Sequence, residues 1–445
     1  MPLALIVAGH GHRVAGSDRS LDQGRISAKF DWLRAQNIDL FPQDGSGVVS
    51  GDQIVVASAA VENSVPDLVV AAQLGCTRQS RAELLAELFN QAPMGIAVGG
   101  TSGKSTVTGM IGWIFHALGA DPTIMNGAVM KNFVSPDAPF ASALVGRGDS
   151  FISEVDESDG SIALYRPTIA VLNNIALDHK SMEELRQLFS GYIGRATKAV
   201  LNADNDEVMQ IATPGAITYS LTGRPATLAA TSIQERPDGV DFSVNGVSVS
   251  LQVPGRHNVA NALAALGAAA AAGLSLDDAA RVLGGFTGLR RRLEHVGTAG
   301  GVTVIDDFGH NPDKIAATLD ALHSFPGRLL LFFQPHGYGP LRLMGEALAE
   351  TFVSRMKPDD HLFLCDPVYF GGTVDRSVGS DHLARMIGAQ AEHIAERERC
   401  GEALIVMARP GDRIIVMGAR DDTLIQFAEA IVAGLEKQAL AFIDE

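Results

Sequence analysis

Ile96-Ala97-Val98-Gly99-Gly100-Thr101-Ser102-Gly103-Lys104-Ser105-Thr106 joins an apolar strand to a helix through a glycine-rich turn. Glycines let backbone N–H groups turn toward an anion, and the N-terminus of the following helix adds its positive end. Lys104 would reach the β- and γ-phosphates, and Ser105 would ligate Mg²⁺. This stretch therefore predicts a site for ATP or GTP, formed by Gly100, Thr101, Ser102, Gly103, Lys104, Ser105 and Thr106.

The stretch departs at one position from the usual phosphate-loop pattern G-x-x-x-x-G-K-[ST]. Val98 stands where that pattern has its first glycine, so Gly100 and Gly103 must form the turn. The alternative is a glycine-rich turn between a strand and a helix that binds no nucleotide.

Polar side chains follow the next two apolar runs, 150–154 and 169–173. Four carboxylates lie within six residues at the end of the first run: Glu154, Asp156, Glu157 and Asp159. The second run leads into Asn173, Asn174, Asp178 and His179. Open α/β sheets bind their ligands at the carboxyl ends of the strands, and Mg²⁺ prefers carboxylate oxygen together with phosphate. These residues predict a magnesium site, with a solvated acidic loop as the alternative.

Composition limits the class of protein. The chain has 445 residues, and typical domain sizes predict two to four domains. Its net charge of −16 disfavours nucleic acid and anionic membranes as partners. No apolar run reaches the roughly 18 residues that span a bilayer. The first 13 residues indicate a short helix without a basic secretion signal, and three widely spaced cysteines favour neither disulfides nor zinc. We expect a cytoplasmic protein.

Alternation of strand and helix patterns predicts an α/β fold of three domains. We place an N-terminal Rossmann-like domain at 1–92, a central ATP-binding domain at 93–292 and a C-terminal Rossmann-like domain at 293–445. Apolar runs bounded by polar turns predict a buried parallel sheet in the central domain. Strict alternation on both sides of Asn245-Gly246 predicts a hairpin. An alanine-rich helix is expected at 259–272, and further strands at 302–305, 329–333, 361–364 and 413–417.

An ordered set of motifs resembles the Mur ligase family, the ATP-dependent amide ligases that build the peptidoglycan stem peptide. The motifs are GGTSGKST, SEVDESDGS, NNIALDH, GRHNVANALAA, FTGLRRRLE, VIDDFGHNP and FQPHGY, and they extend from Gly99 to Tyr338. Within this family the chain most resembles the alanine-adding branch and its tripeptide-recycling relative. The resemblance covers nearly the whole chain and is loosest in the first ninety residues.

The resemblance implies a role for each matching residue. Lys104 would hold phosphates, Ser105 and Glu154 a first Mg²⁺, and His179 a second, with Glu157 the next candidate for a metal or catalytic carboxylate. Residues expected beside the adenine are His257, Asn258 and Asn261. Asn258 has an alternative as a helix N-cap.

Arg291 or Arg292 would reach the γ-phosphate, and we rank Arg292 with Lys104, Glu154 and His179 as catalytic. A solvated linker is the alternative for the arginine run 290–292. Asp307 and His310 would lie on the side of ATP and the acceptor.

The family chemistry implies carboxylate activation. A substrate carboxylate attacks the γ-phosphate, Mg²⁺ and Lys104 stabilise the developing charge, and an amine displaces phosphate from the acyl phosphate. The partners implied are a small-molecule acid and amine.

Two departures from the family pattern bear on the substrates. Residues 1–13 match the helix that follows the family's first strand and phosphate loop, so we expect UDP-N-acetylmuramate to bind weakly while ATP binds normally. Gly337 and Pro340 stand where the alanine-adding branch has arginines, and Asn311 replaces a second histidine. The alternatives are a ligase for another acid outside peptidoglycan synthesis and a nucleotide-binding subunit without ligase activity.

Overall fold

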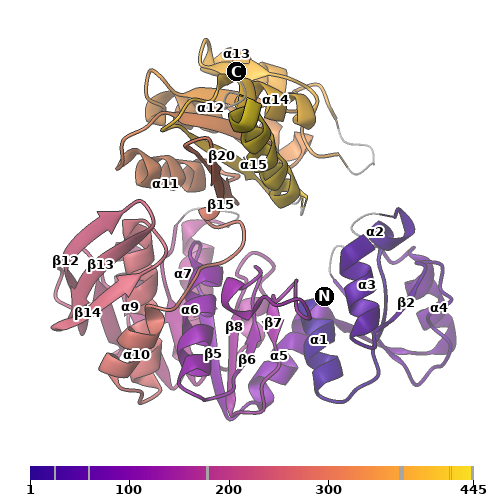
Figure 1. Cartoon of the computed structure of the whole chain (residues 1–445). Coiled ribbons are helices and arrows are strands. Elements are labelled where there is room, and N and C mark those ends of the chain that lie inside the picture. The colour runs from indigo at the N-terminus through magenta and orange to yellow at the C-terminus, as the bar shows by residue number, and fades with distance from the viewer. Residues whose placement is uncertain are drawn as a thin grey trace. The chain divides into compact units, whose positions relative to one another are not determined.

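The computed structural model describes residues 1–24, 27–58, 61–176, 180–369, 375–419, 421 and 423–441. The chain divides into two compact units (Figure 1). The first contains Met1–Glu235 and Gly239–Gly288, and the second contains Arg236–Asp238 and Leu289–Glu445.

A ten-stranded sheet forms the centre of the first unit, in the order β14-β13-β12-β11-β10-β9-β5-β8-β6-β7. Its strands are β5 (Met94–Gly99), β6 (Thr123–Met125), β7 (Ala143–Leu144), β8 (Ser150–Glu154), β9 (Ile169–Leu172), β10 (Lys198–Asn202), β11 (Ile217–Ser220), β12 (Leu228–Arg236), β13 (Gly239–Val244) and β14 (Val247–Leu251). Strand β5 pairs in parallel with β8 on one side and with β9 on the other. The predicted parallel sheet is confirmed, and the carboxyl ends of these three strands meet at one edge.

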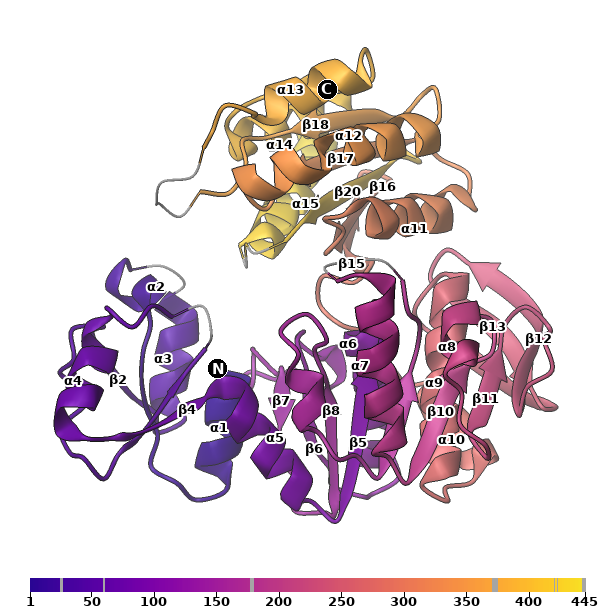
Figure 2. The same ribbon diagram turned by 180° about the vertical axis from the view of Figure 1, so that it is seen from behind.

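Helices cover both faces of this sheet. They are α5 (Arg81–Gln91), α6 (Lys104–Ala117), α7 (Met182–Gly194), α8 (Asp206–Gln210), α9 (Arg256–Ala271) and α10 (Leu276–Leu283), with short 3₁₀ turns at Lys131–Phe133 and Ser161–Leu164. Helices α5 and α7 share a core with Phe151 and Ala170 on one face, seen in front in Figure 2. Helix α6 packs against α9, and both are seen in front in Figure 1.

Local sequence signals explain several element boundaries. Ser80 and Ser181 form capping boxes with Glu83 and Glu184, which fix the starts of α5 and α7. Asn245 and Gly246 both have positive φ, as a type I′ turn requires, so the hairpin β13–β14 forms where it was predicted. The alanine-rich helix is also confirmed, as α9.

The N-terminal residues of the first unit form two small parallel sheets. Strand β1 (Ala15–Ser17) pairs with β2 (Asp39–Phe41), and β3 (Ile54–Ala57) pairs with β4 (Thr77–Ser80). The helices among them are α1 (Pro2–Gly9), α2 (Arg19–Asp22), α3 (Ser27–Ala35) and α4 (Pro66–Leu74). Leu3 and Ile6 of α1 belong to the same core as α5 and α7. The predicted helix at the start of the chain is therefore anchored to the central sheet.

The second unit is a six-stranded sheet with helices, in the order β15-β16-β20-β17-β18-β19. Its strands are β15 (Glu294–Ala299), β16 (Val302–Asp307), β17 (Leu329–Gln334), β18 (His361–Leu364), β19 (Ala391–His393) and β20 (Arg413–Gly418). Its helices are α11 (Pro312–His323), α12 (Tyr338–Arg355), α13 (Ser380–Ile387), α14 (Arg397–Met407) and α15 (Leu424–Ala441). Only β15 runs antiparallel to its neighbour. The four strands predicted in this region are confirmed.

Among the helices that the structure describes, none combines the length and the apolar character needed to cross a membrane.

Candidate active site at the carboxyl edge of the central sheet

The glycine-rich turn leaves the carboxyl end of β5 and enters α6 at Lys104. Gly100 has φ +131° and Gly103 has φ +83°, a region that side chains rarely adopt. A Cβ on Gly103 would also lie 2.7 Å from Oδ1 of Asn261. The backbone of the loop therefore requires both glycines. The turn forms at the N-terminus of α6 although Val98 stands in place of the pattern's first glycine.

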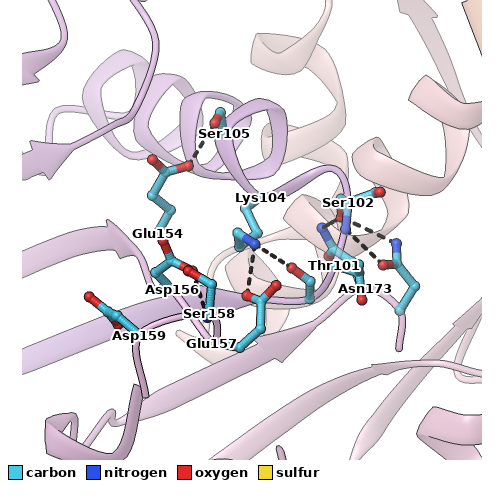
Figure 3. A network of polar contacts seen from close by, with 12 residues as sticks. Thr101, Ser102, Lys104, Ser105, Glu154, Asp156, Glu157, Ser158, Asp159 and Asn173 are labelled. Atoms are coloured by element: carbon cyan, nitrogen blue, oxygen red, sulfur yellow. Dashed lines mark hydrogen bonds and ion pairs between the residues drawn. The ribbon is translucent and has the colours of Figure 1, made fainter. Parts of the chain in front are cut away.

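Lys104 lies across this loop (Figure 3). Its Nζ donates to the carbonyl of Gly100 at 2.7 Å and to Oε2 of Glu157 at 2.8 Å. The Lys104 side chain is 19% exposed and that of Glu157 6% exposed, so the ion pair is largely shielded from solvent. The ammonium group is thus held at the mouth of the loop, where a phosphate would approach.

Ser105 and Glu154 form the oxygen-rich part of the cluster. The Ser105 hydroxyl donates to Oε2 of Glu154 at 2.6 Å, from the first turn of α6 to the end of β8. Hydroxyl and carboxylate oxygens are ligands that Mg²⁺ takes together with phosphate oxygens. The donor set therefore fits the predicted first magnesium site.

Gly127 was not identified from the sequence, although it shapes the same site. A Cβ at this position would overlap with Oε1 of Glu154. The neighbouring Asn126 is fully buried, and its Nδ2 donates to the carbonyl of Ser105 at 3.0 Å. The only signal was an Asn-Gly pair after a short apolar run, which does not distinguish a close contact from an ordinary turn.

Asp156 follows the carboxyl end of β8, near the ion pair of Lys104 with Glu157. Burial by itself would raise the pKa of the Asp156 carboxyl, but hydrogen bonds from Ser158 and the charge of Lys104 outweigh burial and lower that pKa. The Ser158 backbone N–H donates to Oδ1 of Asp156 at 2.9 Å. The carboxylate is thus kept ionised near the proposed metal ligands.

The end of β9 holds the other side of the loop. Oδ1 of Asn174 accepts from the backbone N–H of Ser102 at 2.9 Å, and the Thr101 hydroxyl accepts from the N–H of Ala176 at 3.0 Å. The Nδ2 of Asn173 donates to the carbonyl of Ser102, whereas its buried Oδ1 has no partner among the described residues. An orphaned acceptor against a phosphate loop is consistent with a site for a bound ligand. The prediction for His179 falls outside the described residues.

The start of α9 lies beside Gly103 through Asn261. Asn258 is 6% exposed, its Nδ2 donates to the Pro254 carbonyl, and its Oδ1 accepts from Asn261 at 3.0 Å. The alternative of Asn258 as an N-cap is wrong, because Gly255 occupies that position without a side-chain cap. His257 precedes this asparagine pair in the first turn of the helix.

Arg291 forms its hydrogen bonds within the second unit. It is 9% exposed, its Nε bonds Oδ2 of Asp306 at 3.2 Å, and its terminal nitrogens donate to the carbonyls of Gly418 and Asp421. Burial raises the pKa of Asp306 to about 7 despite Arg291. Arg291 thus stabilises the carboxyl end of this sheet. The alternative of a solvated linker is wrong for Arg291, because this residue is buried.

Arg292 instead lies over an aromatic ring. Its guanidinium carbon is 4.4 Å from the ring centroid of Phe308, in a cation–π contact. The Arg291 guanidinium carbon lies 5.2 Å from the centroid of the same ring, and the contact of either arginine with phosphate stays a prediction.

Asp307 and His310 follow β16. Asp307 is 7% exposed and accepts from the Leu293 and Gly309 backbones and the Thr318 hydroxyl. Nδ1 of His310 lies 2.8 Å from the carbonyl of Phe308, and its ring packs edge to face on that of His336. Burial is the main cause that lowers the pKa of His310 to about 3, and the positive charge of Lys314 is the second. The neutral ring then donates from Nδ1 and presents Nε2 as an acceptor.

Replacing His310 with glutamine is expected to reduce the loss of stability in acid. Between about pH 6.5 and 3 the unfolded chain binds a proton at this histidine that the folded chain does not, so the free energy of unfolding falls as the pH falls. Urea midpoints of both proteins at about pH 7 and 4.5 measure the difference. His295→Gln, at an exposed histidine, is the control. Equal losses in the parent and in His310→Gln would contradict the lowered pKa.

Comparison with known proteins identifies three consecutive domains. Residues 1–92 match the Mur ligase family catalytic domain, residues 98–269 the Mur ligase middle domain, and residues 291–420 the Mur ligase glutamate ligase domain. The chain is 34% identical to UDP-N-acetylmuramate–L-alanine ligase of Synechococcus sp. (strain JA-2-3B'a(2-13)), over 94% of this chain and 87% of the relative. It is 32% identical to the same ligase of Jannaschia sp. (strain CCS1), over 97% and 92% of the two chains.

Solved structures share the fold. The UDP-N-acetylmuramate-alanine ligase of Thermotoga maritima matches with a TM-score of 0.80 at 20% identity, covering 98% of this chain and 96% of that one. A murein peptide ligase of Psychrobacter arcticus matches with a TM-score of 0.69 at 22% identity and the same coverage. The α/β, three-domain architecture expected from the sequence is confirmed. Since all three domains match in order and the identity extends over nearly the whole chain, the protein belongs to the Mur ligase family of ATP- and Mg²⁺-dependent ligases that form amide bonds.

Proposed function

We propose that this enzyme joins the carboxyl group of UDP-N-acetylmuramate to the amino group of L-alanine, with ATP as the energy source. The observation that carries the proposal is the cluster of Lys104, Ser105 and Glu154 at one sheet edge, in a chain 34% identical to a UDP-N-acetylmuramate–L-alanine ligase. The cluster supports the ATP chemistry, and the relative supports the identity of the substrates.

Each residue at the sheet edge has a role in the proposal. The loop formed by Gly100, Thr101, Ser102 and Gly103 encloses the phosphates, with Thr106 on the next turn. Lys104 exchanges its contact with Glu157 for the phosphate that is transferred, and Ser105, Glu154 and His179 hold magnesium. A bound Mg²⁺ neutralises charge on the phosphate oxygens. The Gly100 carbonyl holds the Lys104 ammonium in the loop while its other contact changes from Glu157 to the phosphate.

Residues on α9 and in the second unit are proposed to complete recognition. The amides of Asn258 and Asn261 and the ring of His257 bind the adenine. Arg292 contacts phosphate. Arg291 fixes the adjacent backbone through its bonds to Asp306, Gly418 and Asp421. Asp307 orders the loop that carries His310, whose neutral ring accepts a hydrogen bond from the amine.

The acceptor pocket of this enzyme is expected to differ from that of relatives with arginines after the motif FQPH. Gly337 is the N-cap of α12 with φ +141°, and Pro340 lies in the first turn of that helix. Arg342, the nearest cation, is paired with Asp375 at 2.9 Å with both side chains about half exposed. We expect recognition of the L-alanine carboxylate to depend less on charge, with a KM for the amino acid that changes little with salt.

Phosphate release in a matrix of acids and amino acids tests the proposed function. The expected result is ATP consumption that requires both UDP-N-acetylmuramate and L-alanine. Release with another acid, and none with UDP-N-acetylmuramate, would favour the alternative ligase outside peptidoglycan synthesis. Calorimetry with ATP and with UDP-N-acetylmuramate separately measures the affinity for each substrate. No phosphate release with any pair, together with normal ATP binding, would indicate a nucleotide-binding subunit instead.

A further inference from the structure

A largely shielded carboxylate beyond the carboxyl end of β20 accepts hydrogen bonds from three segments of the second unit. Oδ2 of Asp421 accepts from Nε2 of Gln334 at 2.8 Å and from Nη1 of Arg397 at 3.0 Å, at the end of β17 and the start of α14. Oδ1 accepts from the backbone N–H of Thr423 at 2.9 Å and from its hydroxyl. The side chain of Asp421 is 17% exposed. Asp421 therefore joins the end of a central strand to the starts of two helices.

The described partners of the Asp421 carboxylate are all hydrogen-bond donors. Burial by itself would raise the pKa of Asp421, but hydrogen bonds from Thr423 and Gln334, together with the charge of Arg397, outweigh burial and lower that pKa. The carboxylate is therefore ionised and accepts at both oxygens. An amide of the same shape would turn an NH₂ group toward some of these donors, so the position requires a carboxylate rather than a carboxamide.

The first segment that Asp421 fixes leads to His336. Gln334 is buried at the end of β17, and its amide oxygen accepts from Sγ of Cys365 at 3.5 Å while its amide nitrogen donates to Asp421. His336 follows two residues later, and its ring centroid lies 5.0 Å from that of His310. The backbone that leads to the two histidine rings is thus anchored through both ends of the Gln334 amide.

The second segment that Asp421 fixes carries Arg292. The Asp421 carbonyl accepts from Nη1 of Arg291 at 2.8 Å, and the Gly418 carbonyl accepts from Nη2 at 2.7 Å. The Arg291 carbonyl in turn accepts from the backbone N–H of Phe308 at 2.8 Å. The ring of Phe308 is the one that Arg292 lies over. The position of Asp421 is therefore transmitted to Arg292 through one side chain and one backbone hydrogen bond.

We propose that Asp421 is a positioning residue for the ligase reaction. Its carboxylate and its carbonyl fix, from one point, the end of β17 before His336 and the backbone that carries Arg292. The assignment rests on the proposed function, in which His310 contacts the amine and Arg292 contacts phosphate. Because reacting groups must be closely aligned, movement of either segment is expected to slow amide formation while the fold is kept.

Asp421→Asn tests the assignment, with Asp412→Asn as its matched control at the opposite end of β20. Asp412 is 7% exposed and accepts from Nε and Nη2 of Arg328 and from the backbone N–H of Arg409. Each variant removes a carboxylate that pairs with an arginine, so we expect similar losses of stability in thermal melts. Only Asp421→Asn should lower kcat for phosphate release with acid and amine, by about tenfold or more, and raise the KM for the amine.

Two further measurements separate positioning from a purely structural role. Hydrogen exchange of the free full chain should become faster by about threefold or more in residues 289–293 and 336–339 of Asp421→Asn, and stay unchanged there in Asp412→Asn. The double variant Gln334→Glu with Asp421→Asn exchanges the places of carboxylate and amide, so their hydrogen bond can form with reversed polarity. We expect this double variant to recover kcat relative to Asp421→Asn alone.

Several results would overturn the assignment. Normal kcat in Asp421→Asn, or equal losses of kcat in Asp421→Asn and Asp412→Asn, would show that the carboxylate contributes only stability or nothing. Unchanged exchange in both segments, or a double variant no more active than Asp421→Asn, would exclude the proposed links. If phosphate release requires another acid and amine, the proposed function fails. In that case kcat is measured with the active pair, and the exchange result still decides the role of Asp421.

Discussion

Lys104→Ala is expected to lower ATP turnover at least about a hundredfold, the cost of removing a charge contact in the transition state. The Nζ of Lys104 bonds the Gly100 carbonyl and Glu157, and the substitution removes both contacts. Phosphate release with saturating substrates measures the effect. A thermal melt is expected to show a loss of stability as well, because Glu157 stays buried and loses its cation.

The control for this variant is an exposed lysine of the same domain. Lys198→Ala removes an ammonium that donates to the carbonyl of Ala271, at a place outside the proposed site. It should retain turnover. Unchanged phosphate release in Lys104→Ala would exclude the loop between β5 and α6 as the active site.

Glu154→Gln is expected to raise the Mg²⁺ concentration for half-maximal activity by about tenfold or more, since even outer partners of a metal site change affinity by 10–100-fold. Glutamine keeps the shape and can still accept from Ser105, but it loses the negative charge that attracts the cation. His179→Ala should raise the same requirement. Titration of activity with Mg²⁺ separates this from a packing role. If these variants melt at lower temperature but keep a normal Mg²⁺ dependence, the metal assignment fails.

Gly127→Ala tests the same site by geometry rather than charge. The added Cβ would overlap with Oε1 of Glu154, so the carboxylate must move and the Mg²⁺ requirement should again rise. Gly194→Ala is the matched control, because a Cβ there meets nothing within 4 Å and the residue closes helix α7. A normal Mg²⁺ dependence in Gly127→Ala would show that the position of Glu154 in the structure is not the one used with metal.

The sequence predicts the contacts of some site residues and not of others. Lys104, Ser105 and the glycines of the loop are recognisable because their contacts are local and the turn geometry demands particular residue types. Arg291 and Arg292 are adjacent in sequence and chemically identical. Only the structure shows that Arg291 bonds Asp306 and two carbonyls from the end of β20, more than a hundred residues away, while Arg292 lies on Phe308.

The sequence by itself determined the α/β architecture, the phosphate loop and the polar strand ends. Each of these depends on a short-range pattern of apolar, glycine and capping residues. The order of strands in the sheets was decided only by the tertiary structure, because pairing depends on which long-range contacts bury the most apolar surface. That order places Glu154 beside Ser105 and makes a glycine necessary at 127.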